Sequence, residues 1–495
     1  MRRTPQNYCT YCLMAILLAG CAAGPDFIAP SAPDAASYSG DALPEATPDG
    51  QQTLVVGKDI PSAWWELFHS EAVNKLVEKA VQSNPDIAAA KASLKAAEEN
   101  LYISETAFVP TVKGTATSLR QQTSSASSGG MAPGMTYSLH NASVGVSYYL
   151  DVWGGVRRDV EMKQAKADLA RYELEAAHLA LTSNVVTAAV REASLREQIA
   201  ATKEIISDQK KILEIFDAKF QAGAVAKSDV LAQKAALAEA TAMLPPLEKQ
   251  LAATRHALAA MLGQMPSEKL EELRLDKIEL PKEIPLSLPS KLVEQRPDVK
   301  AAESNMHAAS AAIGVVQAAR LPSIILSADI GSVANAISKL FTPGGGFWSL
   351  GGAASQTLFD AGALAAQEDA ARDAFDAAAA QYRKAVLAAF QNVADALHAL
   401  QSDVETLTAK AESASAAKEA FDLAQARFDA GATGGFELLE ASKAKRQADA
   451  ALVQARAARY ADTAALLAAL GGGWWNRDVK SQPVLSENKS EKGTQ

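Results

Sequence analysis

The hydrophobic pattern divides the chain into long helical stretches and short alternating ones. Residues 154–221 and 361–429 have helical periodicity, and at 1.5 Å per residue each stretch would be about 100 Å long. In the first stretch, apolar side chains recur every 3.5 residues, which is the spacing of a coiled-coil seam. The seam consists of Leu195, Ile199, Ile206, Leu213, Phe216 and Phe220, with Thr202 and Gln209 filling the gaps. We therefore predict two very long helices that pack against other helices.

Shorter helices accompany the two long ones. Residues 85–108 and 297–320 each begin with Pro-Asp, which suits a first helical turn, and each ends before a second proline. Residues 228–262 and 435–470 are predicted return helices. Pro245-Pro246 interrupts only the first of these, so we predict a break there that the second lacks.

Two segments alternate with a period of two residues instead. Residues 142–150 and 323–332 each place apolar side chains on one face, and their partner strands are predicted at 110–120 and 347–359. The two hairpins would cover residues 110–150 and 322–359. Strands of about ten residues with one apolar face suit a transmembrane β-sheet. A soluble, half-buried hairpin would show the same alternation, so the pattern alone leaves both readings open.

The chain is internally duplicated. Matching motifs recur in the same order at a nearly constant offset of 208–212 residues, far longer than a solenoid repeat. The first copy contains Asn84-Pro85-Asp86, Val109-Pro110, Leu150-Asp151-Val152-Trp153-Gly154, Lys219-Phe220-Gln221-Ala222-Gly223-Ala224 and Met261-Leu262-Gly263. Their counterparts are Arg296-Pro297-Asp298, Leu321-Pro322, Phe359-Asp360-Ala361-Gly362, Arg427-Phe428-Asp429-Ala430-Gly431-Ala432 and Ala469-Leu470-Gly471. We therefore assign residues 62–263 to repeat 1, 264–288 to a linker, 289–472 to repeat 2, and 473–495 to a polar tail.

The N-terminus has the features of a bacterial lipoprotein precursor. Arg2 and Arg3 precede a short apolar run at residues 13–18, which is typical of a signal peptide over residues 1–20. The following Leu18-Ala19-Gly20-Cys21 matches the lipobox, so Cys21 is the predicted lipidation site. More than one acyl chain on Cys21 would give firm membrane anchoring. Residues 21–61 are rich in proline and small residues, which predicts an extended, lipidated tether.

Composition and motifs argue against several classes of function. The three cysteines, Cys9, Cys12 and Cys21, all lie at or before the predicted cleavage site, which excludes a disulfide framework in the mature chain. A net charge of −9 disfavours nucleic acid as a partner. The six histidines are scattered, and no metalloprotease, P-loop or serine-hydrolase motif is present. We therefore predict no enzyme activity, no catalytic residue, no metal site and no cofactor.

The predicted strands restrict the architecture further. Two hairpins supply four strands per chain, and an open four-stranded sheet cannot sit in lipid because its edges carry unpaired backbone groups. Single-chain barrels begin at about eight strands. Either an oligomer closes the barrel, or the strands are not in the membrane. Three chains would supply twelve strands and six copies of the repeat.

The chain also resembles the TolC/OprM/NodT outer-membrane factors, from Cys21 to Trp474. The resemblance includes the duplicated motifs above, the lipobox and three further segments: Gly24-Pro25-Asp26-Phe27, Trp64-Trp65-Glu66-Leu67-Phe68 and Ala469-Leu470-Gly471-Gly472-Gly473-Trp474. It implies a mainly α protein with a transmembrane β-barrel. In a homotrimer, four strands per chain would complete a twelve-stranded barrel above a long α-helical periplasmic barrel. It also implies a periplasmic adaptor protein and an inner-membrane pump, usually of the resistance-nodulation-division type, as partners in exporting small molecules across the outer membrane.

The resemblance further implies site residues at the two periplasmic helix turns. Adaptor docking is expected at Phe220, Gly223, Ala224, Asp229, Leu231, Phe428, Gly431, Ala432, Leu438 and Leu439. The two glycines would supply left-handed turns, and Ser228 and Asp229 are predicted helix N-caps. Turn chemistry alone would also account for the glycines and the aspartate. Alanine follows each glycine, where many family members carry leucine or valine, which leaves the adaptor's identity open.

Carboxylates near these turns are gate candidates: Asp422, Asp429, Glu437 and Glu440. An acidic constriction would favour cations, although ordinary solvated helix faces explain each residue equally well. Asp329 and Lys113 are candidates for the barrel lumen.

The sequence is compatible with two alternative functions. A channel for type I protein secretion would have the same architecture, although the lipobox favours efflux. A lipid-anchored periplasmic coiled-coil scaffold without a pore would require the alternating segments to be soluble hairpins. The sequence leaves the exported substrate and the pump open.

Overall fold

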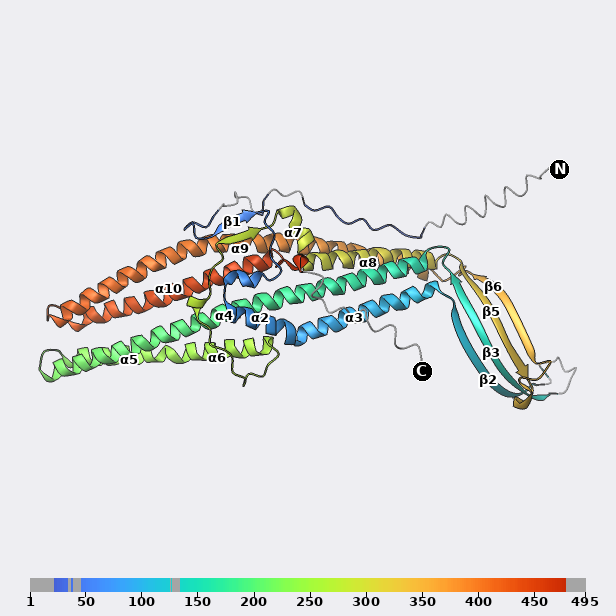
Figure 1. Ribbon diagram of the computed structural model, residues 1–495, viewed down its shortest axis with the longest axis horizontal. Helices are drawn as coiled ribbons and strands as arrows, with labels where there is room; N and C mark the ends of the chain where they lie inside the picture. The colour runs from blue at the N-terminus through green and yellow to red at the C-terminus, as the bar shows by residue number, and fades with distance from the viewer. Residues whose placement is uncertain (1–21, 34–36, 39–45, 125, 127–133, 478–495) are drawn as a thin grey trace. The chain divides into compact units, whose positions relative to one another are not determined.

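The computed structural model describes residues 22–33, 37–38, 46–124, 126 and 134–477 (Figure 1). Cys21 and the predicted signal peptide lie outside the described residues, as do residues 478–495 of the predicted tail. The chain forms two compact units. Unit 1 comprises Met1–Pro30, Ser93–Ala170 and Ala302–Tyr382, and unit 2 comprises Ser31–Ala92, Arg171–Ala301 and Arg383–Gln495. Each unit therefore takes segments from both copies of the repeat.

Unit 1 contains a four-stranded antiparallel sheet. Its strands are β2 (Thr111–Gln122), β3 (Thr136–Leu150), β5 (Ser323–Ala334) and β6 (Gly346–Ser355), in the order β2-β3-β5-β6. Strands β3 and β5 join the two repeats, and Leu150 pairs with Ile324 where they meet the helices.

Two strand boundaries differ from the sequence-based expectation. Strand β3 begins at Thr136, because polar residues at its start continue the ladder with β2 where no hydrophobic alternation shows. Strand β6 ends at Ser355, before the predicted limit of residue 359. Beyond it the chain turns into a helix, and the Asp360 carboxylate accepts hydrogen bonds from the amides of Gly362 and Leu364.

The sheet has one polar and one apolar face. Because side chains alternate along a strand, each row of paired residues points to a single face. Lys113, Gly145, Asp329 and Ser349 form one row, and Gly114, Val144, Ile330 and Trp348 form the next row, on the opposite face. Ser349 donates a hydrogen bond to Asp329. The exposed apolar face, which includes Val144, Ile330 and Trp348, therefore requires an apolar partner.

Two helices of 67 residues, α4 (Gly155–Gln221) and α9 (Ala363–Asp429), are the longest elements. Most of the predicted seam is buried, including Leu195, Thr202, Gln209 and Phe216. Ile212 is buried where Leu213 was expected. A straight α-helix has 3.6 residues per turn, so a strict 3.5-residue seam drifts off the buried side. No helix among the described residues is long and apolar enough to cross a membrane.

The return helices differ between the two repeats. The first is divided into α5 (Lys227–Ala242) and α6 (Leu244–Met261), with Pro245 and Pro246 in the first turn of α6. The second, α10 (Gly435–Ala469), is continuous. The predicted break is therefore present and lies only in the first repeat. The break follows from the two prolines, which remove amide donors from the helical ladder.

Two equivalent junctions in unit 2 place one helix at the end of another. The Asn84 side-chain amide donates to the Met261 carbonyl at 2.9 Å, just before α3 (Pro85–Glu105). In the second repeat, the Arg296 guanidinium donates to the Ala469 carbonyl at 2.9 Å, just before α8 (Pro297–Ala319). Both side chains satisfy carbonyls that lack a partner at the C-terminus of a helix. The duplicated Asn-Pro-Asp and Arg-Pro-Asp motifs therefore connect the return helices to α3 and α8.

A glycine permits the close approach at each junction. Gly263 and Gly471 have φ values of +65° and +97°. A Cβ atom on Gly263 would overlap the Ser83 carbonyl oxygen, and one on Gly471 would lie 2.9 Å from the Gln295 carbonyl oxygen.

The predicted linker, tether and tail are more structured than expected. Strands β1 (Thr53–Val56) and β4 (Glu283–Leu286) form a small parallel sheet that the sequence did not reveal. Four-residue strands give little alternation, and Pro285 weakens the strand signal further. In the tail, the Trp474 indole donates to the Gln295 carbonyl at 2.6 Å. The remaining short elements are α2 (Glu71–Ser83), α7 (Pro289–Gln295), η1 (Trp64–Phe68), η2 (Thr106–Phe108), η4 (Leu275–Lys277), η5 (Ile337–Lys339) and η6 (Trp474–Asn476).

We predict that Gly263→Ala lowers the midpoint of thermal unfolding more than Gly57→Ala does. Gly57 also has a positive φ, +82°, but the space around it is open, so its replacement carries only the left-handed backbone penalty of about 1 kcal/mol. At Gly263 the overlap with Ser83 is added, for a total of roughly 1–3 kcal/mol. Equal midpoints for the two variants, measured by circular dichroism, would contradict the tight junction.

Candidate functional site

The turn from α4 to α5 and the turn from α9 to α10 have the same backbone geometry. Gly223 and Gly431 have φ values of +74° and +71°, so the predicted left-handed turns are present. The amide of Ala224 donates to the Lys219 carbonyl, and the amide of Ala432 donates to the Arg427 carbonyl, both at 2.8 Å. These bonds satisfy the last carbonyls of the long helices in the manner of a Schellman cap.

The N-cap of the first return helix differs from the prediction. The N-cap of α5 is Ala226, two residues before the predicted Ser228, and Ser228 and Asp229 lie in the first turn of the helix. The Asp229 carboxylate accepts a hydrogen bond from the Ala226 amide at 3.2 Å. Asp229 therefore stabilises the helix start from the third helical position, where it also complements the helix dipole.

An aromatic core joins the two turns within unit 2. The Phe216 and Phe428 rings stack with their centroids 5.0 Å apart, and Ile212, Ala424 and Leu438 complete the buried cluster. Lys219 places its ammonium 3.6 Å from the centroid of the Phe428 ring. A Cβ atom on Gly435 would overlap the Phe216 ring, so this glycine makes room for the stack.

Two of the predicted docking residues belong to that core. Phe428 and Leu438 are each only 1% exposed, so they cannot contact an adaptor directly in this conformation. The helical period turns both side chains toward the helical hairpin of α4 and α5. Burial of apolar surface there stabilises the contact between that hairpin and the hairpin of α9 and α10. These two assignments are therefore corrected from docking surface to core.

The other docking candidates lie at the surface or near it. Phe220 and Leu231 are 36% and 56% exposed, and Gly223, Ala224, Gly431 and Ala432 are also exposed. Asp229 and Leu439 are half-buried. Sequence reasoning missed Phe436, which is 74% exposed beside the second turn. The sequence signal for this exposed residue is that Phe436 is apolar but does not lie on the buried face of α10, which includes Gly435 and Leu438.

A buried polar layer lies between the hairpins next to the aromatic core. The Gln209 side-chain amide donates to the Ser442 hydroxyl at 2.6 Å. The Gln233 side-chain amide donates to the Gln209 side-chain oxygen at 2.5 Å and to its carbonyl oxygen at 3.2 Å. Because buried amides need specific partners, this layer fixes which residues of α4, α5 and α10 face one another.

All four gate candidates are exposed, but their surroundings differ. The Glu437 carboxylate forms an ion pair with Arg427 at 3.0 Å, which offsets its charge. Asp429 accepts hydrogen bonds from the Gln425 side chain. Asp422 and Glu440 lie on solvent-facing helix surfaces.

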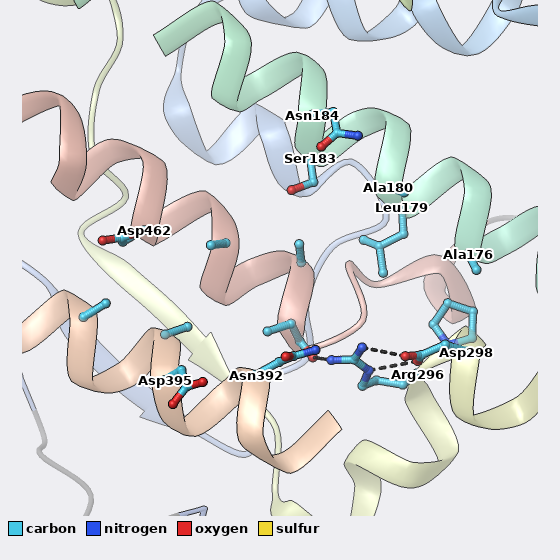
Figure 2. Close-up of a pocket in the computed structure, with 16 residues that line it drawn as sticks. Ala176, Leu179, Ala180, Ser183, Asn184, Arg296, Asp298, Asn392, Asp395 and Asp462 are labelled. Carbon is cyan, nitrogen blue, oxygen red and sulfur yellow. Dashed lines mark hydrogen bonds and ion pairs between the residues drawn. The ribbon is translucent and has the colours of Figure 1, made fainter. Parts of the chain in front are cut away.

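A cavity of about 560 Å³ lies in unit 2 between α4, α9, α10 and the start of α8 (Figure 2). Alanines make up much of its lining, and its charged residues are Arg296, Asp298, Asp395 and Asp462. Arg296 forms an ion pair with Asp298 at 2.7 Å. Burial and a hydrogen bond with Asp462 raise the pKa of the nearby Asp403 carboxyl to about 7, so this pair holds a proton near neutral pH.

The described part of the chain contains no group of three or more His, Cys, Asp or Glu side chains suited to hold a metal ion.

We predict that Gly435→Ala loosens the contact between the two turns. The added methyl group forces Phe216 out of its stack, so amide hydrogen exchange should accelerate in residues 209–233 and 424–442. Gly434→Ala is the matched control, because that position has open space around it and an ordinary φ of −77°. If the two variants exchange alike, the Phe216 stack does not hold the turns together.

Comparison with known proteins places this architecture in a family. The antibiotic efflux pump outer membrane protein ArpC of Pseudomonas putida is 28% identical over 474 residues, covering 95% of this chain and 96% of that protein. The pyoverdine export outer membrane protein OpmQ of Pseudomonas aeruginosa is 28% identical over 438 residues, covering 87% and 92%. Among solved structures, that of the outer-membrane channel OprN has a TM-score of 0.84 at 27% identity, covering 92% of this chain and all of that one.

These similarities confirm the TolC-like fold predicted from the sequence. The sequence model for outer membrane efflux proteins matches twice, at residues 76–264 and 288–472, once in each repeat. The family consists of efflux channels and is not an enzyme family. The chain therefore belongs to the outer membrane efflux protein family.

Proposed function

We propose that this chain is the outer-membrane channel of a tripartite efflux pump, a passive duct through which small molecules leave the periplasm. The observation that carries the proposal is the match of the efflux-protein model to both repeats, together with the sheet that connects them. The functions named for ArpC and OpmQ, antibiotic efflux and pyoverdine export, support a small-molecule cargo.

The sheet supports assembly as a homotrimer. Strands β2 and β6 are its edges, and both are exposed along nearly their whole length. In lipid, their unpaired backbone groups would each cost several kcal/mol, so the edges must pair. Pairing β6 of one copy with β2 of the next would close twelve strands in three copies. The row of Lys113, Asp329 and Ser349 would then face the lumen, and the row of Val144, Ile330 and Trp348 would face lipid.

Lipidation at Cys21 would give each subunit a second attachment to the outer membrane. The lipobox before Cys21 supports this assignment. The periplasmic part would then consist of the long helices and the paired turns.

The paired turns are the proposed docking site for a periplasmic adaptor, which would connect the duct to an inner-membrane pump. Phe220, Leu231 and Phe436 offer exposed apolar surface on the two turns, and the small Ala224 and Ala432 leave the turn backbones accessible. Apolar side chains within a polar rim are the usual anchors of a protein interface. Asp422, Asp429 and Glu440 remain gate candidates, and the Arg427 ion pair makes Glu437 the weakest of the four.

The two alternative functions are less well supported. A type I secretion channel would share the architecture, but the matched relatives named above are efflux and export proteins. A periplasmic scaffold without a pore would leave the apolar face of the sheet in water, which is unfavourable for so many exposed apolar side chains.

We predict that Leu231→Asp and Phe436→Asp each abolish efflux while leaving single-channel conductance unchanged. A charge at the turn disrupts an apolar interface without altering the duct. Leu387→Asp is the control, because Leu387 is also exposed but lies on α9, about 60 Å along the helix from Asp429 at 1.5 Å per residue. The measurement is antibiotic and dye accumulation in the native host after deletion and complementation. Normal efflux in both turn variants, or equal loss in the control, would exclude adaptor docking at the turns.

A further inference from the structure

The first residues after Cys21 pack against the rest of unit 1, in a segment for which the sequence predicted an extended tether. Residues 22–27, which we call the strap, contact the start of α4 and the middle of α8. The Ala23 amide donates to the Trp153 carbonyl at 2.8 Å. The Trp153 indole in turn donates to the Pro322 carbonyl at 2.7 Å, immediately before β5. The strap therefore lies where the helices of unit 1 become strands.

The Arg158 side chain binds both the backbone of the strap and one side chain of the strap. This arginine is only 5% exposed. Its guanidinium donates to the Ala23 carbonyl at 3.0 Å, to the Gly24 carbonyl at 3.3 Å and to the Asp26 carboxylate at 2.7 Å. A further bond at 2.7 Å joins it to Glu161, one turn along α4. A buried guanidinium requires such partners, so removing the strap would leave three of these bonds unmade.

Three glycines provide the space that the strap occupies. Gly24 has a φ of +90°, and a Cβ atom there would collide with Gly314 of α8. A Cβ atom on Gly314 would lie 2.7 Å from the Ala23 carbonyl oxygen and 2.7 Å from Cγ of Arg158. Gly154 has a φ of +77°, and a Cβ atom there would lie 2.8 Å from Cα of Ala22. The backbone of the strap thus passes between α4 and α8 at van der Waals contact.

An aromatic contact completes the docking on the side of α8. The Phe27 ring stacks on the His307 ring with their centroids 4.3 Å apart. The His307 imidazole is 2.9 Å from the Glu161 carboxylate, which also binds Arg158. The strap therefore contacts α4 from the first repeat and α8 from the second, and it connects them beside the paired strands β3 and β5.

We propose that the strap is a fixed mount for the lipid anchor, with Arg158 as its positioning residue. Cys21 directly precedes Ala22 in the sequence, so its acyl chains would be attached one residue from the docked strap. Acyl chains on Cys21 would then enter the membrane at the end of β3 and β5, and would hold the sheet itself and not the end of a loose tether. The inference rests on the proposed function in requiring that Cys21 be acylated and that the sheet lie in the outer membrane.

The test measures the position of the strap directly. A spin-label pair at Ile28→Cys and Ala319→Cys reports the distance between the end of the strap and α8, and both positions are exposed. All three native cysteines lie at or before Cys21, so the acylated mature chain has no other free thiol. Double electron–electron resonance is recorded on full-length, acylated protein in detergent, with labelled subunits diluted by unlabelled ones.

Three variants separate the contributions to docking. Arg158→Met removes all four hydrogen bonds of the guanidinium. Asp26→Asn removes only the carboxylate charge on the strap. Because the Asp26 side chain is 92% exposed, this change leaves the fold of unit 1 intact. Gly314→Ala blocks the strap with a methyl group while improving the helix propensity of α8. Lys166→Met, at an exposed position of α4, is the control for loss of a positive charge.

We expect one narrow distance peak in the unmodified chain and in Lys166→Met. Arg158→Met and Gly314→Ala should lose that peak, and Asp26→Asn should broaden it. A narrow peak that persists in both Gly314→Ala and Asp26→Asn would overturn the proposal, even if Arg158→Met failed to fold. Conductance and the mass of acylated Cys21 are measured on the same samples. A conducting, acylated channel with a broad distance distribution in the unmodified chain would reject the mount while leaving the channel function standing.

Discussion

The open edges of the four-stranded sheet impose the constraint on which the rest of the structure depends. An antiparallel sheet of four strands exposes backbone groups along β2 and β6, and one of its faces carries Val144, Ile330 and Trp348. Exposure of that apolar face to water is unfavourable, and unpaired backbone groups along those edges are unfavourable in lipid. The proposed association with further copies in a membrane would satisfy both requirements.

Within unit 2, the helices are joined by small features that recur in both repeats. Asn84 and Arg296 bind the terminal carbonyls of the preceding return helices, and Gly263 and Gly471 allow the close contact. Each junction therefore joins two shorter helices end to end beside a long helix. At the far end of unit 2, the stacked Phe216 and Phe428 connect the two hairpins. The same hairpins carry the exposed apolar side chains that are proposed to bind an adaptor.

Much of this architecture could be predicted from the sequence because its signals are periodic. Seam residues such as Leu195 and Phe216, the helix-ending Gly223 and Gly431, and the break at Pro245 are local patterns with direct physical causes. Other features depend on contacts between distant segments. Nothing near Phe428 or Leu438 in the sequence shows that they pack against the other hairpin, and nothing near Asp26 shows that it meets Arg158. The parallel pairing of β1 with β4 was missed for the same reason.

We propose that three copies of this chain close a conducting pore. The most direct measurement is single-channel conductance of the purified mature protein in a planar bilayer, with the oligomer mass determined on the same sample. We expect a trimer with a small conductance that increases when Gly435→Ala loosens the turns. A monomer, or a trimer that never conducts even with the turns loosened, would contradict it.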